Sequence, residues 1–484
     1  MSRRNMKEKA FLQERPEKRK KILPLVLCVL ASLFLIVAFL ETLTFNLYHV
    51  FSRPSDYSVL LVLTQLLKIA SYLLVPLAVF LHHRTSKNIL RFLYPLVSVA
   101  SLFCYSEYVS IVKTPENTPN LNHLDLVTLE IYDSINLFMP EWAIKSLFLA
   151  GDILLLLISV LLYFQDNIVG KDLLSLCYLP VVVLVTLPLN IFTEAVSKFP
   201  SDVYDFLVVD NFNFWHLLSF LLVFFMTVVL FYCLRPLSRE KQDFYLQVLA
   251  IVLMIHFMSK NSMLIGDGYN VYNIIFSSIP LFICDIGKFL VFLAVFTRKK
   301  IFYDISFFVH SAGAVSVFFY FGRIQNFGTI LNFSFPYFAI THMILFALAV
   351  LPRMLGHFTF RGRDAVVPAL YYGVVIVLAT ITSVWITNLS ATWTTASGEH
   401  LPELLELNFA FTQINPIPIE LPDIWAITIG YCQVDFLYLL VLYLVYVLIF
   451  TVFFFFQKGV WKIWRLRNRH LLKRRCLPRQ TNTI

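Results

Sequence analysis

Twelve stretches of about twenty apolar residues divide this chain. A helix needs about 20 mainly apolar residues to cross roughly 30 Å of hydrocarbon. The stretches are apolar on every side, as in VVVLVTLPL, whereas the strands of a membrane barrel alternate apolar and polar residues. We therefore predict an all-α, polytopic membrane protein with about twelve transmembrane helices, at residues 22–43, 57–82, 88–109, 144–164, 172–193, 214–234, 244–260, 272–297, 302–322, 336–357, 366–388 and 430–456.

The composition excludes other classes of protein. Of the 484 residues, 58% are hydrophobic and 14% are charged, whereas a soluble domain carries about 25% charged residues. A water-soluble core of this size cannot bury 48 Phe side chains. An ordinary soluble enzyme, a disordered chain and a secreted disulfide scaffold are therefore excluded.

The basic residues indicate the orientation in the membrane. Most of the 39 Lys and Arg residues fall in the two termini and in alternate loops, and basic residues collect on the cytoplasmic side of short loops. The pattern predicts a multi-pass protein of the cell membrane with both termini cytoplasmic. We expect the basic termini, 1–21 and 457–484, to contact anionic lipid headgroups rather than nucleic acid.

The long loops on the other side, 110–143, 194–213 and 389–429, are acidic. They are either solvated loops or a mouth that gathers cations. The seven Cys residues include no pair in these loops, so no disulfide framework is implied. The sequence contains no CxxC, HExxH, GxGxxG or GxxxxGK[ST] motif, and we expect no metal or cofactor.

An internal repeat divides the chain into two halves. Residues 72–105 (YLLVPLAVFLHHR…) resemble residues 288–321 (KFLVFLAVFTRKK…), and VGKDLLSL at 169–176 resembles RGRDAVVP at 361–368. The pattern predicts two parallel six-helix pseudo-repeats, 22–234 and 244–456, joined by a cytoplasmic linker at 235–243.

Several ionisable residues lie within the predicted spans. Asp285 and Lys288 are three apart and share one helix face, and Lys145 and Asp152 are two turns apart on another helix. Lys68 lies in the middle of its span, and we expect it to pair with Asp152 or Asp285. Charges inside a membrane pair with one another or mark a pathway, so these residues form either structural ion pairs or a substrate or proton site.

The second half resembles the YwaF-like family of bacterial integral membrane proteins. The matching segments are IPLFICDIGKFL (279–290), IFYDISFFVHSAGAV (301–315) and FPYFAITHMILF (335–346). The wider group looks related to membrane proteins that move acyl chains between lipids, in which a Cys or Thr and a His do the chemistry. The resemblance implies Cys284 as a nucleophile and His342 as its base.

Three functions remain open from the sequence. The first is a transporter-like permease for a small solute, with a site between the halves lined by Lys68, Lys145, Asp152, Asp285 and Lys288. The second is a lipid acyl-chain transferase that uses Cys284 and His342. The third is a non-catalytic membrane scaffold.

Overall fold

In the part of the chain that the structure describes, eight helices are long and apolar enough to cross a membrane. A computed structural model describes residues 3–42, 50–111, 141–165, 168–192, 195, 200–267, 279–319, 329–332, 334–390, 409–412 and 425–475. Within these residues the eight apolar helical segments are Ile22–Thr42, Val59–Val79, Trp142–Tyr163, Phe214–Leu234, Arg239–Ser262, Ser334–Met354, Gly362–Leu389 and Phe436–Ile463.

These segments confirm eight of the twelve predicted spans. They belong to α1 (Arg3–Thr42), α3 (Val59–Val79), α7 (Glu141–Tyr163), α11 (Phe214–Leu234), α12 (Arg239–Asp267), α18 (Ser334–Met354), α19 (Val366–Ser390) and α20 (Phe436–Arg475). The total of about twelve is not confirmed, because the stretches 88–109, 172–193, 272–297 and 302–322 do not form long, unbroken apolar helices in the described residues.

Proline explains why the stretch 172–193 does not form one helix. It is divided between a 3₁₀ segment η4 (Gly170–Tyr178), a short helix α8 (Leu179–Val185) and a further turn, η5 (Leu189–Phe192). Pro180 lies in the first turn of α8, where a missing N–H costs nothing, and α8 ends before Pro188.

The other three stretches are helical but short, charged or irregular. The stretch 88–109 corresponds to α4 (Arg84–Phe103), which begins with several basic residues, and α5 (Tyr105–Ile111). The stretch 272–297 contains α14 (Ile283–Thr297), which has only 15 residues. The stretch 302–322 is divided into α15 (Lys300–Ile305), a π-helical turn η6 (Ser306–His310) and α16 (Ser311–Ser316).

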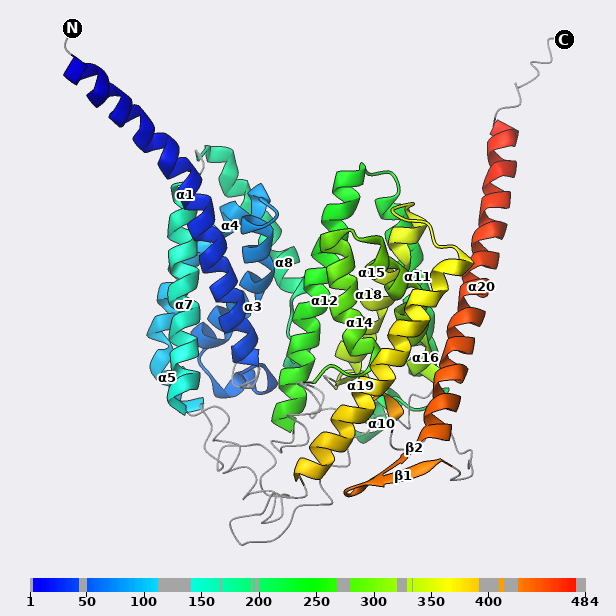
Figure 1. Cartoon of the computed structure of the whole chain (residues 1–484). Helices are drawn as coiled ribbons and strands as arrows, with labels where there is room; N and C mark the ends of the chain where they lie inside the picture. The colour runs from blue at the N-terminus through cyan, green and yellow to red at the C-terminus, as the bar shows by residue number, and fades with distance from the viewer. Residues whose placement is uncertain are drawn as a thin grey trace, which may run out of the picture.

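The helices form two groups with α12 between them (Figure 1). In the first group α1, α3, α4 and α7 contact one another, and in the second α18 contacts α11, α12, α14 and α16. Helix α12 also contacts α1 and α3. Among the described residues, hydrogen bonds link the segment of α8 and η5 to α18 and α12: the Leu189 N–H donates to the Tyr337 hydroxyl at 2.8 Å, and His256 Nε2 lies 2.8 Å from the carbonyl of Val185.

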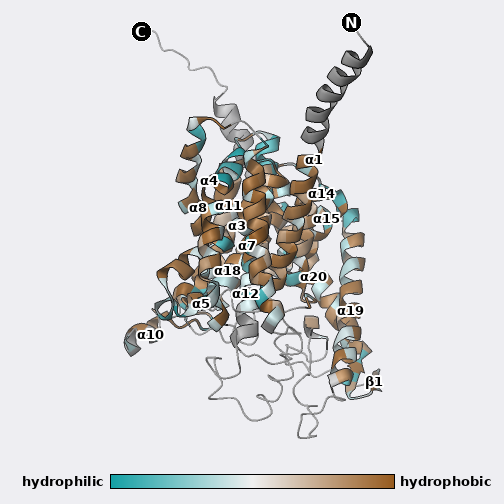
Figure 2. Ribbon diagram, turned by 90° about the vertical axis from the view of Figure 1, so that its left-hand side faces the viewer, coloured by the Kyte–Doolittle hydropathy of each residue, from teal (hydrophilic) through white to brown (hydrophobic). Residues whose placement is uncertain are grey.

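The surface of the bundle suits a lipid environment. Apolar residues run along the length of most helices (Figure 2). Helix α18 is central and mostly buried, whereas α20 exposes side chains such as Leu448 and Phe456, which are 62% and 60% exposed. A bilayer is the solvent in which such a face is stable.

A hairpin of two strands precedes the last helix. Strand β1 (Ala426–Ile429) pairs with β2 (Cys432–Asp435) in antiparallel register. Gly430 in the turn has a positive φ of 62°, and a Cβ there would lie 1.8 Å from Asn388 Oδ1. The predicted span 430–456 therefore begins later, at Phe436, because the preceding residues belong to the hairpin.

Both ends of the chain lie at one end of the bundle, which we call the terminal end (Figure 1). The orientation of this end toward the cytoplasm stays a prediction. Most of the predicted acidic loops lie outside the described residues.

Two connections at the terminal end have matching geometry. His82 before α4 and Arg298 before α15 both adopt left-handed backbone, with φ of 52° and 56°. Asp172 accepts a hydrogen bond from the Val169 N–H at 3.0 Å, and it is bound by the side chains of Arg84 and Arg91. In the same way, Asp364 accepts from the Arg361 N–H at 2.9 Å and pairs with Lys300 at 2.9 Å.

Candidate functional site

A buried ion cluster joins three helices of the first group. Lys68 Nζ on α3 lies 2.8 Å from Glu41 Oε1 on α1 and 3.5 Å from Asp152 Oδ1 on α7. All three side chains are at most 2% exposed. The predicted pairing of Lys68 with Asp152 is therefore present. We call these three residues the first-group cluster.

Neighbouring side chains complete the hydrogen bonds of this cluster. The Tyr72 hydroxyl donates to Glu41 Oε2 at 3.0 Å, and the Ser101 hydroxyl donates to Asp152 Oδ2 at 2.7 Å. The Lys68 ammonium also lies 4.4 Å from the centre of the Phe148 ring. Buried charges need such partners, because desolvation costs several kcal/mol per ion.

The first-group cluster holds more acid than base. Its two carboxylates face a single ammonium, so full ionisation leaves one net negative charge in a buried position. A proton or a cation can balance that charge. The arrangement is therefore capable of binding a positive charge as well as joining helices.

A second group of polar side chains gathers at the start of α14. Lys288 Nζ lies 2.6 Å from Asp285 Oδ1, which confirms that these two residues share a helix face. The Cys284 sulfur is 4.0 Å from the same carboxylate oxygen. Cys284 is half-buried and belongs to the first turn of the helix, which begins at Ile283. We call Cys284, Asp285, Lys288, Lys260 and His342 the second-group cluster.

Two lysines influence the thiol. Lys260 on α12 and Lys288 both act electrostatically on Cys284. The Lys288 ammonium lies 4.3 Å from the centre of the Phe257 ring, and that of Lys260 lies 5.8 Å from the centre of the Phe338 ring. With Asp285 as its one acid, this cluster has an excess of positive charge, which is the opposite of the first-group cluster.

His342 is held in one tautomer. Its Nδ1 lies 2.7 Å from the carbonyl oxygen of Phe338. A carbonyl only accepts hydrogen bonds, so Nδ1 carries the proton and Nε2 keeps its lone pair. This Nε2 is buried and has no hydrogen-bond partner among the described residues. It is therefore available as a hydrogen-bond acceptor.

The structure divides the five charged residues that we expected at one site. Lys68 and Asp152 belong to the first-group cluster, and Asp285 and Lys288 belong to the second. Lys145 is half-buried on α7, two turns from Asp152. A single set of ion pairs that includes all five residues is not seen in the described part of the chain.

The proposed nucleophile and base lie in one electrostatic environment. His342 and Cys284 each interact with Lys260, Lys288 and Asp285. No hydrogen bond joins the two residues, because His342 Nε2 has no partner among the described residues and Nδ1 is bound to a carbonyl.

Sequence reasoning missed Glu41 and Lys260. Both lie close to the end of an apolar stretch, where a charge is easily taken for a membrane-boundary residue. The signal for Glu41 was the uncompensated Lys68, since a mid-span lysine requires an acid within reach. In the described part of the chain, no group of three or more His, Cys, Asp or Glu side chains is placed to hold a metal ion.

Comparison with known proteins identifies the second half of the chain. Residues 211–446 match the TMEM164 family. This segment runs from just before α11 into the first third of α20 and contains the whole second-group cluster. The chain is thus a multi-pass membrane protein that is similar to the TMEM164 family over these residues. No curated protein and no solved structure matches it.

Proposed function

We propose that the chain transfers acyl groups between membrane lipids, with Cys284 as nucleophile and His342 as general base. The observation that carries this proposal is the environment of the thiol. Cys284 lies in the first turn of α14, near the positive end of the helix dipole, in a cluster that also holds Lys260, Lys288 and His342. Its thiol is half-buried and lies 4.0 Å from the Asp285 carboxylate, so it needs a base to react, and we assign that role to His342. The resemblance of the second half to proteins that move acyl chains supports the same chemistry.

The proposed reaction has two steps. In the first, His342 Nε2 takes the thiol proton, and the sulfur attacks the ester carbonyl of a donor lipid. A C–S bond forms, the ester C–O bond breaks, and the leaving lyso-lipid oxygen takes the proton from His342. In the second, His342 Nε2 takes the proton of an acceptor lipid's hydroxyl, whose oxygen attacks the thioester carbonyl. A new ester C–O bond forms, the C–S bond breaks, and the proton passes from His342 to the sulfur, which restores the thiol.

Lys260 and Lys288 have a clear role in this scheme. Their positive charges stabilise the thiolate and the oxyanion of the tetrahedral intermediate, and the positive end of the α14 dipole, where Cys284 lies, acts in the same sense. Substrate binding would bring the acyl carbonyl between Cys284 and His342, because catalytic hydrogen bonds often tighten only in the bound complex.

The test is covalent labelling of the full chain in nanodiscs that contain phosphatidylcholine with an alkyne-tagged acyl chain. We expect a hydroxylamine-sensitive label on the protein that is lost in Cys284→Ala and reduced about 100-fold or more in His342→Gln. Cys233→Ala is the matched control, since Cys233 is an exposed cysteine on α11. Equal labelling of Cys284→Ala and the control would refute the proposal.

A permease is the second candidate, and the first-group cluster favours it. Its surplus carboxylate is suited to carry a proton across part of the membrane. The test is proton flux into proteoliposomes loaded with a pH-sensitive dye. We expect Asp152→Asn to abolish the flux while Cys284→Ala leaves it unchanged. Unchanged flux in Asp152→Asn would exclude this function for the cluster.

Although α11, the last helix of the predicted first half, packs against α18 of the second, we also propose that residues 22–234 and 244–456 are pseudo-repeats, with both termini in the cytoplasm. Three features support this layout: the matching left-handed residues His82 and Arg298, the matching capping residues Asp172 and Asp364, and the position of both termini at one end. The two ion clusters then lie on corresponding helices, α1, α3 and α7 in one group and α12, α14 and α18 in the other. Protease protection of tags on both termini in sealed vesicles tests the orientation.

A further inference from the structure

A pocket at the terminal end lies apart from both ion clusters. It lies between the end of α18, the η8 turn (Gly362–Ala365), the π-helical turn η6 and α20. Its volume is about 370 Å³, within the size range of small-molecule sites. None of the residues that line it belongs to the first-group or second-group cluster.

The walls of the pocket are aromatic and aliphatic. Phe307, Phe360 and Phe454 are buried against it, and Trp461 and Val350 complete the apolar lining. On the outer side, α20 exposes Phe456 to the lipid. An acyl chain can therefore pass from the bilayer along the pocket wall without contact with water.

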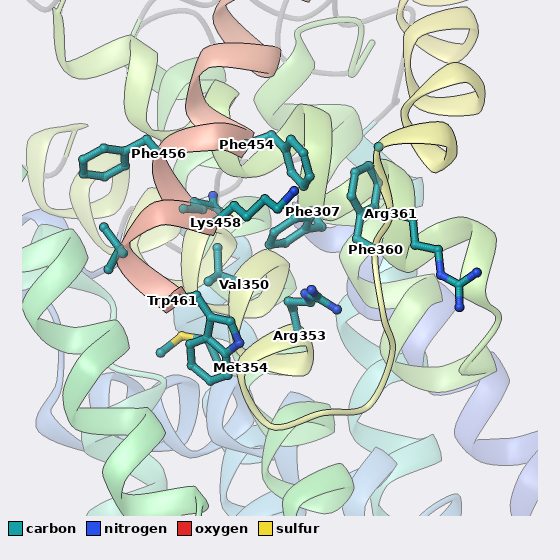
Figure 3. A pocket seen from close by; sticks show the side chains of 13 residues that line it. Phe307, Val350, Arg353, Met354, Phe360, Arg361, Phe454, Phe456, Lys458 and Trp461 are labelled. Atoms are coloured by element: carbon teal, nitrogen blue, oxygen red, sulfur yellow. The ribbon is translucent and has the colours of Figure 1, made fainter. Parts of the chain in front are cut away.

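The charged groups of the pocket all have one sign. Arg353, Arg361 and Lys458 line it, and no acidic residue does. Figure 3 shows Lys458 extending from α20 towards Phe454 and Phe307, with Arg353 on the side of α18 and Arg361 pointing outwards. Phosphate is the anionic group that such a set of basic side chains binds best.

The pocket also offers a hydrogen-bond acceptor. Gln457 Nε2 donates to the Ser311 hydroxyl at 3.2 Å, which fixes the amide, and Gln457 Oε1 is buried without a partner among the described residues. This oxygen can accept a hydrogen bond from a hydroxyl group. A phosphate diester that carries a hydroxylated headgroup satisfies both the basic residues and the amide oxygen.

The depth of the pocket in the membrane agrees with a headgroup. The apolar segment of α18 ends at Met354, and that of α20 ends at Ile463. The basic residues of the pocket therefore lie where hydrocarbon gives way to the polar interface. Trp461 lies at the same level, where tryptophan is enriched in membrane proteins.

We propose that this pocket binds one anionic phospholipid with a hydroxylated headgroup, such as phosphatidylglycerol. Lys458 and Arg353 bind its phosphate, Gln457 accepts from the headgroup hydroxyl, and the aromatic wall holds the upper part of an acyl chain. The proposal is independent of the chemistry at Cys284.

The test measures binding of tail-labelled fluorescent phosphatidylglycerol to the full chain in detergent micelles. A charge-assisted hydrogen bond contributes about 1.5–3 kcal/mol, so we expect Lys458→Gln and Arg353→Gln each to weaken binding about tenfold or more. Lys462→Gln is the matched control, because it removes the same charge from an exposed position of α20 outside the pocket. We expect the control to change binding less than about twofold.

A second pair of variants tests whether the pocket must be open, without changing charge. Gly362 lines it, and a Cβ there would meet no atom within 4 Å. We expect Gly362→Leu to weaken binding, whereas Gly459→Leu, at a glycine with equally open surroundings outside the pocket, leaves it unchanged.

Three results would overturn the proposal. The first is an equal loss in Lys462→Gln, since binding would then depend on general surface charge. The second is equal competition by phosphatidylcholine with the same acyl chains, and the third is displacement by soluble glycerol 3-phosphate at the same concentration as the lipid. Loss in the pocket variants alone, with neither competitor effective, supports it.

Discussion

Replacement of Lys68 by methionine tests whether the first-group cluster stabilises the helix bundle as a set of ion pairs. Methionine keeps most of the volume of the side chain and removes the ammonium. Glu41 then retains only Tyr72 as a hydrogen-bond donor among the contacts described above, and Asp152 retains Ser101. Two carboxylates that are 2% and 1% exposed are left without their cation.

The expected loss follows from the burial. Removal of one partner from a buried ion pair costs about 3–5 kcal/mol, because the remaining charge stays desolvated. We expect Lys68→Met to lower the free energy of unfolding by this amount. The measurement is equilibrium unfolding of the purified chain in mixed micelles of increasing SDS content, followed by tryptophan fluorescence.

A charge-free cluster separates this cause from a loss of packing. The triple variant E41Q/K68M/D152N has no buried charge, and neutral replacements of buried ion pairs are often tolerated. We expect it to recover most of the stability that Lys68→Met loses. A loss below about 1 kcal/mol in Lys68→Met, or an equal loss in the triple variant, would refute the electrostatic reasoning.

Three further predictions concern the fold. Hydrogen bonds from the backbone N–H of Val169 and from Asn88 and Arg84 hold the pKa of Asp172 below its usual value. The ionised Asp172 carboxylate therefore stabilises the fold above about pH 4, and this stabilisation is lost as the pH falls through the folded-state pKa. In thermal unfolding, Asp172→Asn should be less stable than the wild type at pH 7, and the difference should shrink in acid. Gly287→Ala should destabilise the protein by about 1–3 kcal/mol, because a Cβ there would lie 2.6 Å from His310 Nδ1. Tyr337→Phe should cost about 1 kcal/mol, because it removes the acceptor of an inter-group hydrogen bond.

Each of these predictions has a control or a contrary outcome. A pH-independent difference between Asp172→Asn and the wild type would show that ionisation of this carboxyl does not matter. Gly459→Ala, where a Cβ meets no atom within 4 Å, should leave stability almost unchanged. Unchanged unfolding of Tyr337→Phe would show that the hydrogen bond from Leu189 does not contribute to stability.

Local sequence patterns predicted the membrane class and several charge pairs. The apolar stretches gave eight of the spans, because the length of hydrocarbon to be crossed sets the length of the helix. The pairing of Asp285 with Lys288 follows from helical spacing alone. The predicted helix at 172–193 was not confirmed, because hydropathy alone takes no account of the backbone restrictions of proline. Pro180 and Pro188 divide this stretch.

The apolar stretches alone predict that this chain lies in a membrane and that mid-span charges such as Lys68 need partners, since hydrocarbon cannot solvate them. Which residues become those partners depends on how the helices pack. Glu41 reaches Lys68 because α1 and α7 both pack at that level of α3, and Lys260 joins Cys284 because α12 lies against α14. Such contacts depend on the rotation and height of whole helices, which are set by the packing of many side chains together and not by any local pattern.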